Sequence, residues 1–211
     1  PQRIEQTARL AELLLFDAQM RTDLDDLTEA ASNLSEGERL FREELGAEER
    51  AFLTAIERCQ VLIQAGRVIE ASDVARSVRT SLTASSAART KAFQCEAQSA
   101  LLQGGYAGSF HLANAGLRTF HNDEKSVAAT VAADLHSIAA LTLEAAGFVT
   151  EATDRWRYVT QYSGDALSAR SFSAATHRAR LLQMAGDLQG ALKTIEPFFD
   201  SEFGRETAIR H

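Results

Sequence analysis

Proline is almost absent from this chain of 211 residues, where it occupies only positions 1 and 197. A proline inside a helix removes a backbone hydrogen bond and clashes with the preceding turn. Almost nothing in the sequence therefore interrupts a helix. Aromatic residues make up only 7% of the chain, whereas apolar residues make up 45%. The core must consist mainly of aliphatic and alanine side chains.

Cysteine is equally scarce, with Cys59 and Cys95 as the two examples. They form no C-x-x-C pair, and a metal site would need further ligands. Both lie among small residues in helical stretches, so we expect buried free thiols, which suit a reducing, cytoplasmic location. No apolar run approaches the roughly 20 residues of a membrane span, and no signal peptide is evident. Because the chain begins at Pro1 rather than Met, we expect a segment of a longer protein.

Positive charge is in deficit, and the net charge is −7. Because an acidic chain repels a phosphate backbone, we expect no direct nucleic-acid binding. Without a membrane span, we expect no membrane partner either. Only three of the 22 basic residues are lysines. Arginine offers a planar fork that suits carboxylates, although a genome-wide preference for arginine explains the bias equally well.

The residue patterns of catalytic sites are missing too. The five histidines are scattered, and none has a second metal ligand four residues away on a helix. The glycine-rich stretch 104–108 follows no strand, as a phosphate-binding loop would, and no serine lies in a nucleophile elbow. We therefore expect no enzyme activity, no metal and no cofactor.

An internal repeat organises most of the chain. It is marked by glycines spaced 39, 42 and 39 residues apart, at Gly66, Gly105, Gly147 and Gly186. Four residues before them come the leucines Leu62, Leu101, Leu143 and Leu182. Five residues after them come Ala71, Phe110, Ala152 and Ala191, and twelve after them Val78, Leu117, Val159 and Phe198. Because glycine can adopt the left-handed conformation that ends a helix, each unit is predicted to be a helical hairpin that must stack on its neighbours.

The repeat predicts an all-α chain with at least four hairpins in residues 47–205. The helix pairs are expected at 48–65 with 68–81, 86–103 with 107–120, 124–146 with 149–162, and 166–185 with 188–199. Capping signals precede the later units at Ser85-Ser86, His121-Asn122-Asp123 and Ser163-Gly164-Asp165. No stretch shows the alternation of a strand.

The two ends of the chain fit the repeat poorly. Helical spacing runs from Ile4 to Ala18 and again from Leu24 to Leu34, and Ser35 and Gly46 are predicted to bracket a short helix. We interpret residues 1–46 as an N-terminal helical cap or a degenerate repeat. Residues 200–211 are short and polar, and form either a tail or the start of a truncated repeat.

The glycine, the small residue five later and the apolar residue twelve later resemble the consensus of the tetratricopeptide-like (TPR-like) superfamily. The unit here is nearer 40 residues than the usual roughly 34, and the early Trp and the unit-ending Pro of the family are absent. Phe110 stands where the family has alanine, so the second hairpin is expected to be splayed. Long units of this kind are similar to the repeats in sensor regions of some bacterial transcription activators. The resemblance implies a right-handed α-solenoid.

The resemblance also implies that the first helix of each hairpin lines a concave groove. Residues two, three and six before each glycine would face it, and the polar ones are expected to bind a partner: Gln60, Gln64, Ser99, Gln103, Glu144, Arg180 and Gln183. Such a mixed lining suits an extended peptide or a helix, but it equally suits a solvated surface. Trp156 is expected to pack against the neighbouring hairpin rather than a partner.

Two hypotheses for function follow. In the first, the chain is a non-catalytic interaction module that binds a protein or peptide segment, or a small effector. It would be the regulatory or sensor region of a larger bacterial signalling or transcription-regulatory protein. In the alternative, it is a structural scaffold or oligomerisation module of a larger complex, and association between copies is left open. A helix-turn-helix or signalling domain elsewhere in the parent protein would favour the first hypothesis.

Overall fold

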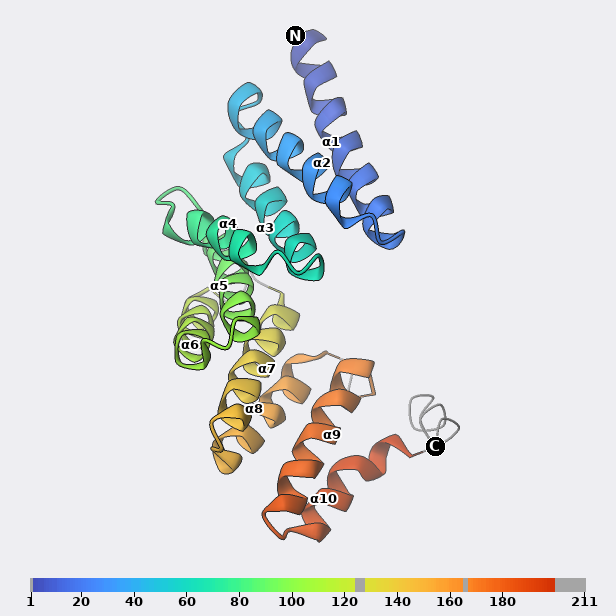
Figure 1. Cartoon of the computed structure of the whole chain (residues 1–211), viewed down its shortest axis with the longest axis vertical. Helices are drawn as coiled ribbons and strands as arrows, with labels where there is room; N and C mark the ends of the chain where they lie inside the picture. Colours follow the sequence, from blue (N-terminus) through green and yellow to red (C-terminus); the bar gives the residue numbers. More distant parts are fainter. Residues whose placement is uncertain (1, 124–127, 165–166, 200–211) are drawn as a thin grey trace.

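The computed structural model describes residues 2–123, 128–164 and 167–199, and regular structure in these ranges is entirely helical. Successive helices pair as hairpins that stack from the N-terminal to the C-terminal end of an elongated molecule (Figure 1). The predicted all-α class is confirmed. The pairs are α1 (Gln2–Asp23) with α2 (Leu27–Arg39), α3 (Glu48–Gln64) with α4 (Val68–Thr80), α5 (Ser86–Leu102) with α6 (Tyr106–Asn122), α7 (Ala129–Ala145) with α8 (Val149–Tyr162), and α9 (Ala169–Met184) with α10 (Leu188–Ile195).

Most predicted boundaries of the array agree with the structure to within one or two residues. Ser85 caps α5 as expected, since its hydroxyl accepts a hydrogen bond from the backbone N–H of Ala88 at 3.1 Å. The two later capping signals are wrong. His121 and Asn122 belong to α6, and α9 is capped by Ser168 rather than by the segment at Ser163. Residues 124–127, 165–166 and 200–211, on which part of these predictions falls, lie outside the described residues.

The first 46 residues form a hairpin of their own, and α2 packs against α3. The predicted short helix between Ser35 and Gly46 is wrong, because α2 runs through Ser35 and continues as a π-helical turn over Leu40–Glu44. Within α2, Gly37 is buried, and a β-carbon there would lie 2.8 Å from Cδ1 of Leu15. This glycine therefore lets α1 and α2 approach closely.

The second repeat is shifted by one residue from the predicted alignment. Gly66, Gly147 and Gly186 have φ angles of +73°, +80° and +84°, as expected for helix-ending glycines. In the hairpin of α5 and α6, however, the left-handed residue is Gly104, at +77°, and Gly105 has a φ of −80° and is the N-cap of α6. Because two glycines are adjacent here, the sequence alone could not show which of them ends the helix.

The shift removes the reason to expect a splayed second hairpin. The residue five after Gly104 is Ser109, which is fully buried and donates a hydrogen bond to the carbonyl oxygen of Ala97 at 2.8 Å. Phe110 lies beside this position and is half-buried. A small residue therefore holds the α5–α6 contact as it does in the first and third repeats, where Ala71 and Ala152 are fully buried.

The four leucines of the predicted repeat are less buried than expected. Leu62 is buried, but Leu101, Leu143 and Leu182 are half-buried. The most buried position lies one residue nearer the start of the helix in the last two units, at Thr142 and Leu181. The large side chains at the repeat leucines therefore cover the edge of the core rather than fill it.

Small side chains dominate the interior, as the low aromatic content predicts. Cys59 and Cys95 are buried free thiols, which confirms the expectation for both. The Cys59 thiol donates to the carbonyl oxygen of Ala71 at 3.3 Å. A hydrogen bond with Cys59, together with burial, raises the pKa of the Cys95 thiol well above its usual range. Across the described ranges, no helix combines the length and the apolar character needed to cross a membrane.

The shifted turn predicts opposite effects for two glycine substitutions. Gly104→Ala should lower the free energy of unfolding by about 1 kcal/mol, because an alanine is strained at a positive φ. Gly108→Ala should raise it by roughly 0.5 kcal/mol, since Gly108 is exposed within α6 with open space around it and alanine favours a helix. Urea unfolding followed by circular dichroism measures both. Equal effects of one sign would contradict the assigned turn.

The burial pattern predicts a second contrast. Leu135 on α7 is fully buried, so Leu135→Ala should destabilise the chain by roughly 2–5 kcal/mol. Leu143→Ala should cost about half as much, because that side chain already contacts solvent. Thermal and chemical unfolding of the two variants test the order, and a larger loss for Leu143→Ala would show that the side-chain packing of α7 is different.

Candidate functional site

The first helices of the hairpins lie on the inner side of the stack. Helix α3 contacts α5, and α5 contacts α7, whereas the second helices α4, α6 and α8 make at most marginal contact with one another. Closer spacing on one side of a stack makes that side concave. The concave surface of the middle of the molecule is therefore lined by α3, α5 and α7.

A groove of about 300 Å³ lies on this surface where α3, α5 and α7 meet. Its floor is aliphatic, with Leu53, Ile56 and Val131, and its polar side chains include two amides, Gln60 and Gln94. A smaller depression of about 160 Å³ adjoins it toward α1 and α2, and shares Glu57 and Gln60 with it. The concave surface is thus a mixed lining across five helices, and the polar residues in it come from successive turns.

Polar contacts join the first helices across the groove. The side-chain amide of Gln94 on α5 donates to Asp134 on α7 at 2.9 Å. The other oxygen of Asp134 pairs with the guanidinium of Arg170 on α9 at 2.9 Å. Burial raises the pKa of Asp134, while Arg170 and Gln94 act in the opposite direction. The Gln94–Asp134–Arg170 chain therefore links three hairpins from the concave side.

Two charged residues in the groove are left without an ionic partner. Glu57 on α3 and Lys91 on α5 line the same groove, but within the described part of the chain neither forms an ion pair. Burial raises the pKa of Glu57, while the charges of Lys91 and Arg50 act in the opposite direction. Both charges are therefore open to groups from a binding partner.

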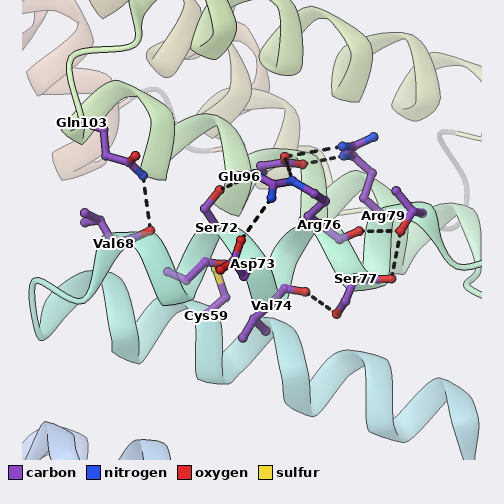
Figure 2. A network of polar contacts seen from close by, with 12 residues as sticks. Cys59, Val68, Ser72, Asp73, Val74, Arg76, Ser77, Arg79, Glu96 and Gln103 are labelled. Carbon is purple, nitrogen blue, oxygen red and sulfur yellow. Dashed lines mark hydrogen bonds and ion pairs between the residues drawn. The ribbon is translucent and has the colours of Figure 1, made fainter.

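The structure brings together only part of the predicted binding set. Gln60 and Gln64 line the concave surface. Ser99 is fully buried and does not line it, because the shifted second repeat turns this residue into the core. Gln103 lies at the turn after α5, where its amide reaches the carbonyl oxygen of Val68 at 3.5 Å (Figure 2).

Two of the remaining predicted residues, Glu144 and Arg180, belong to the junction between the last two hairpins. Glu144 is half-buried and accepts hydrogen bonds from the indole N–H of Trp156 and the guanidinium of Arg180, while His177 lies 3.2 Å away. Trp156 is buried and stacks on the His177 ring at 4.4 Å, so it faces the neighbouring hairpin as expected. The Glu144 carboxylate is therefore already occupied. Gln183 is exposed near the end of α9.

Sequence reasoning missed Glu57, Lys91, Gln94 and Asp134. They lie nine to thirteen residues before the turn glycines, on earlier turns of the same first helices. The prediction considered only the last two turns before each glycine. Extending the helical period backward by one and two turns from Gln60 would have found the missing positions.

Buried carboxylates join other hairpins in the same way as Glu144. Glu96 on α5 is buried and receives Arg76 and Arg79 from α4, and these contacts stand at the centre of Figure 2. At the junction of the first two hairpins, Glu38 pairs with Arg42 and Arg58. A buried charge is costly unless it is paired, so these clusters fix how one hairpin sits on the next.

The largest of these cavities, about 620 Å³, lies on the opposite side of the stack, between α6, α7 and α8. In it, His136 stacks on Tyr158 and Tyr162, with ring centroids 5.0 and 5.6 Å apart. Desolvation by burial, followed by the nearby charge of Arg155, lowers the pKa of His136 to about 4. The imidazole is therefore neutral at physiological pH. Within the described residues, no group of three or more metal-binding side chains could hold a metal ion.

Comparisons with known proteins show a fold and no closer relationship. No family model matches the chain, and no curated protein matches its sequence. Among solved structures, the nearly identical TPR-like repeats assigned to a Podosopora anserina kinesin light chain have a TM-score of 0.67 and 18% identity, and the match covers 90% of this chain and 93% of that one. MamA has a TM-score of 0.61 and 11% identity, with 94% of each chain covered.

A third similar structure is YrrB, described as a TPR protein with an unusual peptide-binding site. Its TM-score is 0.54 and its identity 13%, and the match covers 100% of this chain and 97% of YrrB. The fold is TPR-like. The expected TPR-like solenoid is thereby confirmed, with the N-terminal region contributing a hairpin to the stack.

The neutral His136 of this TPR-like chain predicts a specific loss of stability in acid. Between pH 6.5 and 4 the unfolded chain takes up a proton at this ring and the folded chain does not, so stability falls as the pH falls. This amounts to roughly 2–3 kcal/mol over that window. His136→Phe should remove the effect, as measured by urea unfolding across the range.

Comparing the wild type with His136→Phe separates the effect of the histidine on stability from the effects of the carboxyl groups. The raised pKa values of Glu57 and Asp134 stabilise the folded chain as the pH falls, with the opposite sign, but they are common to both proteins. His111→Gln, at an exposed position on the neighbouring helix α6, serves as the control. An unchanged pH dependence in His136→Phe would show that this ring takes up its proton in the folded state.

Proposed function

We propose that the chain is a non-catalytic interaction module that binds an extended peptide segment along the concave groove over α3, α5 and α7. The observation that carries the proposal is the pair Glu57 and Lys91. They are opposite charges that face one groove and attract each other, but neither forms an ion pair within the described residues. A partly desolvated carboxylate without a partner is unfavourable, and a basic residue of a bound peptide would relieve it.

The rest of the lining suits a peptide backbone. The amide of Gln60 can both donate and accept. The N–H₂ group of Gln94 donates to Asp134, while its side-chain oxygen accepts no hydrogen bond from the described residues. The aliphatic floor at Leu53, Ile56 and Val131 offers space for apolar side chains of the peptide. Recognition of a peptide in a groove commonly combines these two elements. The peptide we expect carries a basic and an acidic residue a few positions apart.

The role of such a module in a larger protein follows from the same features. A stack of hairpins that binds a segment of another protein can regulate an attached domain, as expected for the sensor region of a bacterial signalling or transcription-regulatory protein. YrrB, which shares the fold, is described as having a peptide-binding site. We propose that peptide binding in the groove serves this regulatory role.

One observation favours the alternative, a scaffold or oligomerisation module. The outer face of α1 carries a row of exposed apolar side chains at Leu10, Leu13, Phe16 and Met20. Such a face at the end of a stack can join a second molecule. Sedimentation of the wild type beside a Leu13→Gln/Phe16→Gln variant tests it, and a monomer at all concentrations would contradict the alternative.

A double charge reversal tests the groove. Glu57→Lys/Lys91→Glu preserves the net charge but inverts the charge pattern of the lining. Peptides selected from a displayed random library on the wild-type chain should bind the reversed variant about ten-fold more weakly, a loss of about 1.4 kcal/mol expected for one misplaced charge pair. Fluorescence anisotropy with the labelled peptides measures the affinities.

The matched control reverses an exposed ion pair outside the groove. Arg67, the N-cap residue of α4, pairs with Glu70 at 2.6 Å, so Arg67→Glu/Glu70→Arg changes as many charges at the surface. It should leave peptide binding unchanged. Equal binding by the wild type and both reversed variants would place the peptide elsewhere on the molecule.

A further inference from the structure

The cavity between α6, α7 and α8 contains an arginine whose charge has no acidic partner. Arg155 on α8 is half-buried, and one of its terminal nitrogens donates to the side-chain oxygen of Asn114 on α6 at 2.7 Å. The other lies 3.4 Å from Nδ1 of the neutral ring of His136. The guanidinium also lies 5.9 Å from the centre of the Phe110 ring. Every group that contacts this cation is uncharged.

This arrangement is unusual within the same molecule. Three other junctions between hairpins each place a largely buried carboxylate against arginines, at Glu38, Glu96 and Glu144. At the junction of the α5–α6 and α7–α8 hairpins, the described chain provides the arginine but no carboxylate within ion-pair distance. Burial lowers the pKa of Arg155, which is the direction expected for a desolvated cation without an anion. The missing charge must therefore come from another molecule or remain uncompensated.

The walls of the cavity restrict what that molecule can be. Phe110 and Tyr158 supply aromatic surface, and Tyr158 remains partly open to solvent. Two carboxylates lie at the exposed edge of the same cavity, Glu151 and Asp154, and Asp154 also pairs with Arg157 at 3.5 Å. They repel a polyanion, so a nucleotide or another multiply charged anion is disfavoured. They attract a positive group on a ligand whose single negative group reaches Arg155.

We propose that this cavity binds a small zwitterion of the aromatic amino acid class. Its carboxylate pairs with the free N–H groups of Arg155, its ring packs against Phe110 and Tyr158, and its ammonium group faces Glu151 and Asp154. The cavity of about 620 Å³ is large enough for such a molecule. Because a guanidinium presents five N–H groups in a planar fork, Arg155 can bind a carboxylate while it still contacts Asn114. This site is separate from the groove and does not depend on the proposed peptide binding.

Three matched probes test each part of the ligand. L-phenylalanine carries the ring, the carboxylate and the ammonium group, L-phenylalaninamide lacks the carboxylate, and 3-phenylpropionate lacks the ammonium group. Dissociation constants come from titrations of the full chain followed by ¹H–¹⁵N NMR. We expect saturable binding of L-phenylalanine at millimolar concentration. The other two compounds should each bind about ten-fold more weakly, the effect of losing one charge-assisted contact.

Variants at Arg155 separate a binding role from a structural one. Arg155→Gln should weaken L-phenylalanine about ten-fold and leave the Tm within a few degrees, because the arginine forms no ion pair that the variant would break. Arg155→Lys keeps the charge but not the fork, and its affinity should lie between those of Arg155→Gln and the wild type. Arg67→Gln at the N-cap of α4 is the control and should bind as the wild type does.

Several outcomes would overturn the proposal. Absence of saturable binding by L-phenylalanine rejects the ligand class, and equal binding by L-phenylalaninamide rejects the pairing with Arg155. Equal binding by 3-phenylpropionate rejects the role of the acidic edge. A large fall in Tm for Arg155→Gln with unchanged affinity shows that the arginine serves only to pack the junction.

Discussion

Everything in this structure depends on how closely two helices approach each other after a left-handed turn. The residue five positions after the turn glycine is alanine or serine in every hairpin of the repeat array, and it is fully buried in the first three. A larger side chain there would separate the paired helices and open the space that now holds the core. Because single hairpins cannot bury their apolar faces, the separation would also disturb the stacking on the next pair.

Because the paired helices meet through small residues, ion pairs contribute strongly to the contacts between neighbouring hairpins. Alanine and serine provide little side-chain contact between neighbouring hairpins. The orientation of one hairpin relative to the next is therefore determined by longer side chains at the edges of the core. Glu38, Glu96 and Glu144 fulfil this role through arginines, and the concave side adds the bridge from Gln94 to Arg170 through Asp134. The surplus of arginine over lysine in the sequence thus has a structural use, because a planar fork can satisfy a buried carboxylate with two contacts.

The sequence predicted the helices, most of their boundaries and the kind of stack, because each follows from local chemistry: a glycine at a turn, a serine cap, a helical period. It failed where two candidates stood side by side. Gly104 and Gly105 are chemically identical, and only the backbone geometry distinguishes the one with positive φ. That single step displaced Ser99 from the predicted groove into the core. The pairing of Glu144 with Arg180 could not be predicted, because these residues lie 36 positions apart and meet only when hairpins stack. For the same reason, the sequence could not show that no carboxylate of the described residues pairs with Arg155.

Helix α7 has a particular position among these features. Asp134 lies on the concave groove, and His136, two residues later, lies in the cavity on the other side. Residues two apart on a helix differ by about 200° around its axis, so one rigid cylinder forms part of both surfaces. A rotation of α7 about its own axis cannot reshape one surface and leave the other as it was. If a molecule bound on one surface rotates α7, it changes the affinity of the other surface for its own ligand. Thermodynamic linkage requires the coupling free energy to be the same in both directions.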